Sequence, residues 1–225
     1  MRTLVDWLDE RLQIREIKVA LFDRKIPKGV GWIYTLGSLS LGIFLLQSVT
    51  GILLAMNYSP SPQFAYESVS YITHQVTLGN IVRGLHKWGA SAMVLIVTLH
   101  MIRVYFMGSY KYPRELSWVV GVFIWLIVMG FGFTGYLLPW DQKGYWATMV
   151  GTTIAEQAPL VGPALAKLLR GGDTLGTVTL TRFYAIHVLV LPALVLTLIA
   201  LHLFFVVRQG ISAPPERDKP DGPHA

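Results

Sequence analysis

The chain has 225 residues, of which 53% are hydrophobic and 14% are charged, with a mean hydropathy of +0.49. Soluble domains carry about 25% charged residues, so this composition argues against a water-soluble globular domain, and its apolar and aromatic content excludes disorder. The chain has no cysteine, which excludes disulfides, thiolate metal sites, iron–sulfur ligands, a catalytic thiol and a haem attached through cysteine. Because the formal net charge is +6, the positive charges are first tested as a signal of membrane orientation.

The first 31 residues are charged and amphipathic, without the pattern of a cleavable signal peptide. Apolar residues lie between their charges: Val5, Leu8, Leu12, Val19 and Leu21. We expect a helix that lies on the membrane surface over 1–31, with a disordered basic tail as the alternative. We expect a membrane domain over 32–208 after it. A tail over 209–225, which is rich in proline and charge from Pro214, should be disordered.

Three stretches without charged residues lie between Lys28 and Glu67, between Glu115 and Asp141, and between Arg182 and Arg208. Each can hold the roughly 20 residues that a spanning helix needs. A fourth apolar stretch carries Arg83, Lys87 and Arg103 near its ends, where long side chains can snorkel or pair. The sequence therefore predicts an all-α bundle of four membrane-spanning helices, at about 32–56, 79–107, 115–138 and 178–208.

Two prolines shape these helices. Pro139 should end the third helix, and Pro192 should kink the fourth because it removes a backbone hydrogen bond.

Positive charge is distributed unevenly over the connecting segments. Twelve lysines and arginines lie in the N-terminal segment, the loop between the second and third helices and the C-terminal tail, against three in the loop between the third and fourth helices. The positive-inside rule then places both termini in the cytoplasm and the chain in the cytoplasmic membrane as a multi-pass protein. We do not expect nucleic-acid binding, because topology accounts for the charge excess.

Four of the six histidines lie inside two predicted spanning helices. His86 and His100 are 14 residues apart in the second, and His187 and His202 are 15 apart in the fourth. At about 1.5 Å per residue these intervals rise about 21 and 22 Å. Both helices run in the same direction, so His86 and His187 share an outer depth and His100 and His202 an inner depth. His74 lies in a loop and His224 in the tail.

Two facing pairs of imidazoles in an apolar bundle suit haem iron with two axial ligands. A tetrahedral zinc site needs its four ligands close together. A proton relay needs polar steps between the levels, whereas Met93, Val94 and Ile96 are apolar. With both axial positions filled, such an iron transfers electrons and binds no oxygen. The alternative is that these histidines only form hydrogen bonds between helices.

Arginines and glycines recur near the histidines. Arg83 precedes His86 by three residues and Arg103 follows His100 by three, positions from which guanidinium groups could bind haem propionates, with snorkelling as the alternative. Glycines recur at 14-residue intervals on the other two helices: Gly37 and Gly51, then Gly121 and Gly135. Since glycine lets a large planar group approach a helix, we expect each haem to be edged by these two helices.

The loop from Pro139 to Val178 is about 40 residues long, and such loops are usually functional. It contains Tyr145, Trp146 and the amphipathic stretch Ala164–Arg170. We expect an interfacial element that covers an amphipathic ligand, with a lid that has no such role as the alternative.

Four segments carry a resemblance that covers most of the chain: RGLHKWGASAMVLIVTLHMIRVY, KYPRELSWVVG, TGYLLPWDQKGYWA and TLTRFYAIHVLVLP. They are similar to cytochrome b6 and to the N-terminal half of cytochrome b in quinol–cytochrome c oxidoreductases. The unequal histidine intervals and the ending after four helices resemble the split cytochrome b6 type. The resemblance implies an enzyme subunit, active only within its complex, that moves electrons across the membrane in a Q-cycle coupled to proton translocation.

The resemblance also implies site residues and partners. It places an outer quinol pocket at Tyr136, Ala147, Met149 and Val150, and an inner quinone region near Arg208. It implies two non-covalent haems b, a separate subunit with the remaining cytochrome b helices, a Rieske iron–sulfur protein, a c-type cytochrome and a dimeric complex. Cytochrome b6 carries a cysteine for a further haem where this chain has Thr35, so we expect no cysteine-linked haem c.

Two alternatives stay open at this point. A di-haem membrane anchor of a dehydrogenase or hydrogenase would share four helices and four histidines, although the LPWDQ segment and the long loop argue against it. A transporter that relays protons through histidines is the non-redox alternative.

Overall fold

The computed structural model describes residues 3–12 and 27–214. Within these ranges the chain forms helices and connecting turns and no strand. The elements, in chain order, are α1 (Leu4–Leu12), η1 (Trp32–Thr35), α3 (Leu36–Ala55), α4 (Ala65–His74), α5 (Gly79–Phe106), α6 (Glu115–Leu137), α7 (Gln142–Glu156), α8 (Gly162–Arg170), α9 (Thr177–Ala185), η2 (Ile186–Val190) and α10 (Leu191–Gln209). Of the surface segment expected over 1–31, the structure describes α1, while residues 13–26 lie outside the described part.

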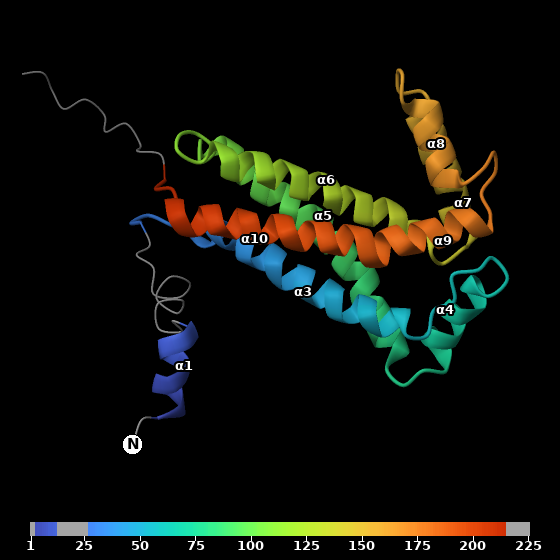
Figure 1. Ribbon diagram of the computed structural model, residues 1–225, viewed down its shortest axis with the longest axis horizontal. Coiled ribbons are helices and arrows are strands. Elements are labelled where there is room, and N and C mark those ends of the chain that lie inside the picture. Colours follow the sequence, from blue (N-terminus) through green and yellow to red (C-terminus); the bar gives the residue numbers. More distant parts are fainter. Residues whose placement is uncertain (1–2, 13–26, 215–225) are drawn as a thin grey trace, which may run out of the picture.

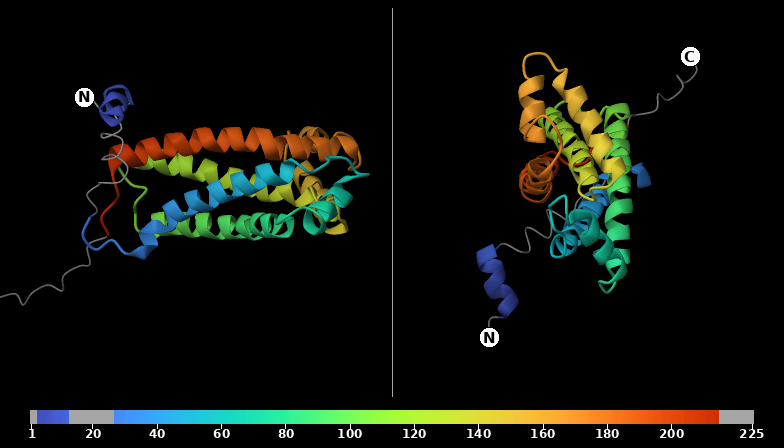
Figure 2. Two further views of the ribbon diagram at one scale, coloured as in Figure 1. Left: turned by 90° about the horizontal axis from the view of Figure 1, so that it is seen from below. Right: turned by 90° about the vertical axis from the view of Figure 1, so that its right-hand side faces the viewer.

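Four long rods run side by side and form the body of the molecule (Figures 1 and 2). Each is long and apolar enough to cross a membrane: Trp32–Ala55, Gly79–Phe106, Glu115–Leu137 and Thr177–Gln209. Their ends agree with the predicted ranges to within one or two residues. The prediction of an all-α bundle with four membrane-spanning helices is therefore confirmed.

Large apolar side chains point outward from all four rods. Leu45, Leu95, Phe123 and Leu196 are each more than half exposed, although they lie near the middle of their helices. A protein in water would not expose so much apolar surface along its whole length. Hydrocarbon is the solvent that matches this surface, so the chain is a multi-pass membrane protein.

The interior of the bundle has one apolar layer at its centre. One buried residue from each rod forms it: Phe44, Met93, Val128 and Val195, joined by Val97. Phe44, Met93 and Val128 each lie seven residues from both members of the glycine or histidine pair on their own helix. The two histidine levels are therefore separated by packed side chains that carry no titratable group.

The rods pack most closely in three pairs, α3 with α5, α5 with α6, and α6 with α10. The histidines lie in α5 and in the fourth rod, which consists of α9, η2 and α10, and these two rods are not among the closely packed pairs. Their backbones thus stand further apart, which leaves room between them for a group larger than a side chain.

The fourth rod changes from α-helix to π-helix and back around His187. It runs as α-helix in α9, as π-helix over Ile186–Val190, and again as α-helix from Leu191. Pro192 lies in the first turn of α10, where its missing N–H removes a backbone donor from the turn before it. The structure shows a π turn directly before this proline, and the kink that the sequence predicted there stays a prediction.

The π turn accounts for the unequal histidine intervals. A π turn inserts one extra residue into an α-helix. The 15 residues between His187 and His202 therefore correspond to the 14 residues between His86 and His100. Both helices present their two histidines at the same two levels.

Short helices gather at one end of the bundle. In Figure 1, α4, α7, α8 and α9 lie together at the right-hand end. Asp141 starts α7 by accepting a hydrogen bond from the Gly144 N–H at 2.8 Å, as a helix N-cap does. The long loop predicted after Pro139 is therefore mostly helical, and α8 matches its predicted amphipathic stretch.

The segment before η1 and the last described residues meet at the other end of the bundle. A Cβ on Gly29 would lie 3.4 Å from Pro214. Ser212 and Ser109 share a hydrogen bond of 2.6 Å, and Gln209 donates to the Pro113 carbonyl at 2.7 Å. The first residues of the tail expected over 209–225 are thus tied to the loop before α6. Residues 215–225 lie outside the described part, so disorder there stays a prediction.

Candidate functional site

We call His86 and His187 the outer pair, and His100 and His202 the inner pair, after the depths that the sequence predicts. The ring centres of the outer pair are 6.5 Å apart and their planes are inclined by 71°. Two imidazoles bound to opposite sides of one metal, with bonds of about 2.0 Å, have ring centres roughly 6 Å apart. The outer pair therefore has the spacing that a shared metal requires.

The inner pair comes from the same two rods: His100 lies in α5 and His202 in α10. Nδ1 of His202 donates to the Ser117 carbonyl at 3.0 Å. Since this bond uses Nδ1, the Nε2 lone pair is left for a ligand.

Each of the four predicted glycines faces one of the four histidines. A Cβ on Gly37 would lie 3.1 Å from Cε1 of His100, and one on Gly51 would lie 3.2 Å from Cε1 of His86. On α6, a Cβ on Gly121 would lie 3.5 Å from Cε1 of His202, and one on Gly135 would lie 2.7 Å from Cε1 of His187. The sequence assigned the space beside these glycines to a haem edge, whereas the structure shows imidazole rings in it.

Thr50 and Thr134 contact the outer pair and were missed by the sequence analysis. Thr50 Oγ1 lies 2.9 Å from Nδ1 of His86, and Thr134 Oγ1 lies 3.0 Å from Nδ1 of His187. The signal that could have found them is a repeated Thr–Gly pair, at residues 50–51 and 134–135, on the two helices that carry the glycines.

Arg103 is buried beside the inner pair. Its guanidinium lies 3.5 Å from the centre of the Tyr34 ring, and its Nε and Nη2 have no hydrogen-bond partner among the described residues. A buried guanidinium without a partner is costly, so these donors fit an anionic group that the chain itself does not supply. Haem propionates are such a group. Arg83, the matching residue at the outer level, is half-buried.

Gln47 is a second buried donor, at the outer level. Its Nε2 also has no partner among the described residues, and it lies against Gly89, one turn after His86. The residues around both histidine pairs thus fit haem in three respects: opposed imidazoles, helices held apart, and unpaired donors.

Other metal chemistry fits these residues less well. The described part of the chain has no group of three or more histidine, aspartate or glutamate side chains that could hold a metal ion. The apolar layer around Phe44 and Met93 separates the two histidine levels. Neither a tetrahedral zinc site nor a chain of proton-relay groups matches this arrangement.

The residues predicted for a quinol pocket lie where α7 packs against the end of α6. A Cβ on Gly144 would lie 2.5 Å from the Tyr136 carbonyl, which shows how closely the two helices meet. Tyr136, Ala147 and Val150 are exposed there, and Met149 is half-buried. The chain brings these four residues to one corner, but their exposure shows that it does not enclose a pocket around them. Arg208, at the opposite end, is exposed and lies over the Phe204 ring.

Arg170 ties α8 to α7 at this corner. Its Nε donates to Thr152 at 2.8 Å, its Nη2 to Thr153 at 2.9 Å, and its Nη1 lies 3.0 Å from a Glu156 carboxylate oxygen. Its carbonyl accepts a hydrogen bond from Thr179 of α9. One buried side chain thus fixes α7 in the position that presents Met149 and its neighbours.

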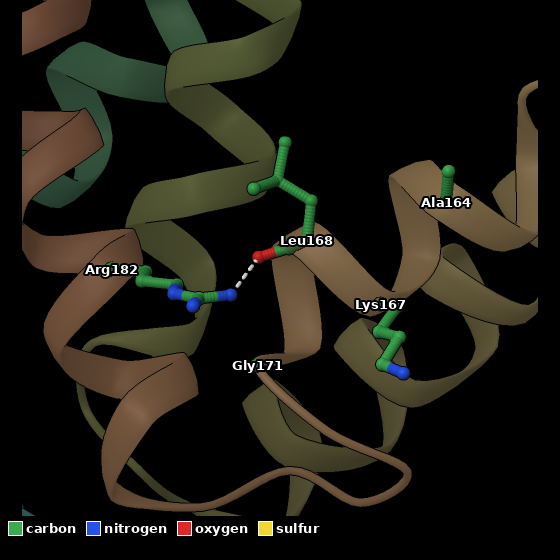
Figure 3. Close-up of a pocket in the computed structure, with 5 residues that line it drawn as sticks. All are labelled: Ala164, Lys167, Leu168, Gly171 and Arg182. Carbon is green, nitrogen blue, oxygen red and sulfur yellow. Dashed lines mark hydrogen bonds between the residues drawn. The ribbon is translucent and has the colours of Figure 1, made fainter.

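A shallow depression of about 410 Å³ lies between α8 and α9 (Figure 3). Arg182 donates to the Leu168 carbonyl in it, and Gly171 ends α8 in a left-handed conformation at φ +77°. This contact is a second link that fixes the α7–α8 segment to the bundle.

The fold is a membrane-spanning four-helix bundle that carries histidines at two levels, an arrangement that fits a b-type cytochrome. The family described as Cytochrome b/b6/petB matches residues 21–210. The chain is 46% identical to the menaquinol:cytochrome c reductase cytochrome b subunit of Geobacillus thermodenitrificans, over 95% of this chain and 99% of that protein. It is 45% identical to cytochrome b6 of Synechococcus elongatus, over 95% of this chain and 100% of that protein. The chain belongs to the cytochrome b/b6 family.

A solved structure agrees with this assignment. A chain of a "Hyperthermophilic respiratory Complex III" superposes with a TM-score of 0.85 at 35% identity, covering 98% of this chain and 59% of that one. Membership of a cytochrome b family implies haem b. The relatives are cytochrome b subunits, which favours the cytochrome b interpretation over the di-haem anchor and the proton-relay transporter.

Proposed function

We propose that the chain is the di-haem cytochrome b subunit of a quinol–cytochrome c reductase, and that it transfers electrons across the membrane between two quinone-reacting sites. The observation that carries this proposal is the pairing of His86 with His187 and of His100 with His202 at matching depths. The names of the relatives, which include a menaquinol:cytochrome c reductase subunit, support the same substrate class.

Two non-covalent haems b fit the two pairs. Haem iron with two imidazole ligands supplies one-electron transfer and no oxygen chemistry. A glycine faces each imidazole, and His86, His187 and His202 each make a hydrogen bond at Nδ1. The packed apolar layer around Phe44 and Val195 excludes water between the two levels. Arg103 and Arg83 would bind propionates. Because the chain has no cysteine, a haem cannot be held to it by a cysteine thioether bond.

Quinol oxidation takes place at the outer corner in this proposal. Tyr136, Ala147, Met149 and Val150 form one wall, and their exposure supports a second wall contributed by another subunit with the remaining cytochrome b helices. Quinol releases two electrons and two protons there. One electron goes to a Rieske iron–sulfur protein and on to a c-type cytochrome, and the other crosses from the outer to the inner level. Two such electrons, from two quinols, and two protons taken up from the inner side reduce one quinone to quinol near Arg208.

Orientation follows from the positive charges. We place both termini on the cytoplasmic side of the cytoplasmic membrane, because lysine and arginine are concentrated in the segments at that end. Proton release outside and proton uptake inside then store energy across the membrane. The chain is active only within its complex, which we take to be dimeric.

The experiment that tests this function is purification of the complex through a tag on this chain. We expect a Rieske protein and a c-type cytochrome to co-purify, and the complex to reduce cytochrome c with quinol. The reduced-minus-oxidised spectrum should show b-type bands, and haem staining after denaturing electrophoresis should leave this chain unstained. Absence of b-type bands, or co-purification with a dehydrogenase in place of a Rieske protein, would contradict the proposal.

A further inference from the structure

Among the described residues, the outer pair of histidines has hydroxyl partners at Nδ1 that the inner pair lacks. Thr50 and Thr134 are only 3% and 5% exposed, and each contacts Nδ1 of one outer histidine. Each threonine also directly precedes the glycine that faces the same histidine, Gly51 for His86 and Gly135 for His187. Two helices from different parts of the chain thus repeat one hydroxyl–glycine arrangement at one depth.

The direction of these hydrogen bonds follows from the other bonds of the two hydroxyls. Thr50 Oγ1 donates to the Leu46 carbonyl at 2.7 Å, and Thr134 Oγ1 donates to the Gly130 carbonyl at 2.8 Å. A hydroxyl has one proton, so each oxygen accepts from the imidazole, and Nδ1 carries the hydrogen. Both outer imidazoles are therefore held with an unprotonated Nε2, which is the form that ligates a metal.

The inner pair is held differently. His202 donates to a backbone carbonyl, that of Ser117, and His100 has no hydrogen bond to another described residue. Leu36 and Val120 precede the inner glycines, where threonine precedes the outer ones. The two levels have the same ligand type but different acceptors at Nδ1.

We propose that Thr50 and Thr134 are positioning residues that fix the outer histidine tautomers and separate the reduction potential of the outer haem from that of the inner haem. This inference rests on the proposed function. An acceptor at Nδ1–H raises the basicity of an imidazole ligand, and a more basic ligand stabilises the oxidised iron. The threonine hydroxyls thus hold the outer potential below the value that the same ligands would give without them.

Redox titration of the purified complex, followed at the b-type absorption bands, tests this. In Thr50→Val and Thr134→Val we expect the equilibrium constant for reduction of the outer haem to increase two- to tenfold. This corresponds to a rise in its reduction potential of about 20 to 60 mV for one electron. The inner potential should stay at its parent value. Thr50→Ser and Thr134→Ser keep the hydroxyl, so the outer potential in these variants should equal that of the parent.

Thr197→Val is the matched control. Thr197 makes the same bond to a carbonyl one turn earlier, that of Ala193, but it is exposed on α10. Its replacement should leave both potentials unchanged. A shift in this control as large as that in Thr134→Val would overturn the proposal, because the shift would then not depend on the imidazole contact.

Two further outcomes decide the inference. An outer potential equal to that of the parent in both valine variants, with both haems bound, would show that the two hydroxyls do not set this potential, and it would overturn the proposal. Loss of the outer haem alone, reversed by serine, would support the positioning role, whereas loss that serine does not reverse would contradict it. A parent complex without two b-type haems would instead contradict the proposed function.

Discussion

Gly135 and His187 are the tightest of the four glycine–histidine pairs, because a Cβ on Gly135 would lie 2.7 Å from Cε1 of the imidazole. Real Cβ contacts essentially never come this close, so the ring would have to move. We expect Gly135→Ala to displace His187 and to remove the outer haem while the inner haem stays bound. Haem content per chain and the reduced-minus-oxidised spectrum measure this.

Two other glycine variants control this prediction. Gly132 lies on the same helix with no atom within 4 Å of its Cβ position, so Gly132→Ala should keep both haems. Gly121→Ala should have a milder effect at the inner level, because its Cβ would lie 3.5 Å from His202. Equal haem loss in Gly132→Ala and Gly135→Ala would show that the contact with His187 is not the cause.

Arg103 should raise the reduction potential of the inner haem, since a positive charge stabilises the extra electron. We expect Arg103→Leu to lower that potential by a free energy of the order of 1 kcal/mol, and Arg103→Lys to lower it less. The outer potential should change little. Redox titration measures the potentials of the two haems separately. Arg83→Leu is the converse control, because it should change the potential of the outer haem more than that of the inner haem. Unchanged potentials in both leucine variants would contradict the proposal that Arg103 and Arg83 contact haem propionates.

Arg170 should stabilise the α7–α8 corner. Arg170→Met removes its bonds to Thr152, Thr153 and Glu156, and we expect a local loss of about 2–4 kcal/mol. Hydrogen exchange of the α7 and α8 amides in the intact complex measures this loss. Glu156→Gln is the control, with an effect below about 1 kcal/mol because that carboxylate is partly exposed. Unchanged protection of α7 in Arg170→Met would contradict the assignment.

Tyr58 should make the complex sensitive to alkaline pH. Its hydroxyl donates to the Leu138 carbonyl at 2.6 Å, and burial, with a smaller effect of Tyr184, raises its pKa above the usual value. A raised pKa means that the folded state holds the proton more tightly, so the stability from this group is present below pH about 10 and is lost as the pH rises above it.

Tyr58→Phe tests this pH dependence. The variant should be less stable by about 1 kcal/mol at neutral pH, since one hydrogen bond is lost. It should also lose less stability than the parent between pH 8 and pH 11. Thermal unfolding of the complex at a series of pH values gives both quantities. The same alkaline loss in the variant and the parent would show that another group is responsible.

Much of this architecture could be predicted from the sequence. Long uncharged stretches predicted three of the spanning helices, and an apolar stretch with charges near its ends predicted the fourth. The intervals between His86 and His100 and between Gly121 and Gly135 predicted the two levels, because these signals depend only on helix length and geometry. The contact of Thr134 with His187 depends on how two helices are rotated against each other, which periodicity in one helix does not determine.

The remaining differences have similar physical causes. The π turn at His187 depends on where the backbone accommodates Pro192, and the sequence showed only that a hydrogen bond would be lost. The helices α4 and α7 are too short and too polar for a hydropathy signal, and packing against the rods stabilises them. The glycines beside the histidines were identified, but which group fills the space beside them depends on the packing of α3 on α5 and of α6 on α10.

The most direct test of the central claim is the haem content of His187→Ala and His202→Ala, measured on the purified complex by spectrum and by extracted haem b per chain. The parent should hold two haems b, His187→Ala only the inner one, and His202→Ala only the outer one, each with its own potential. A parent without haem b, or two haems b retained in both variants, would contradict the assignment of His187 and His202 as iron ligands.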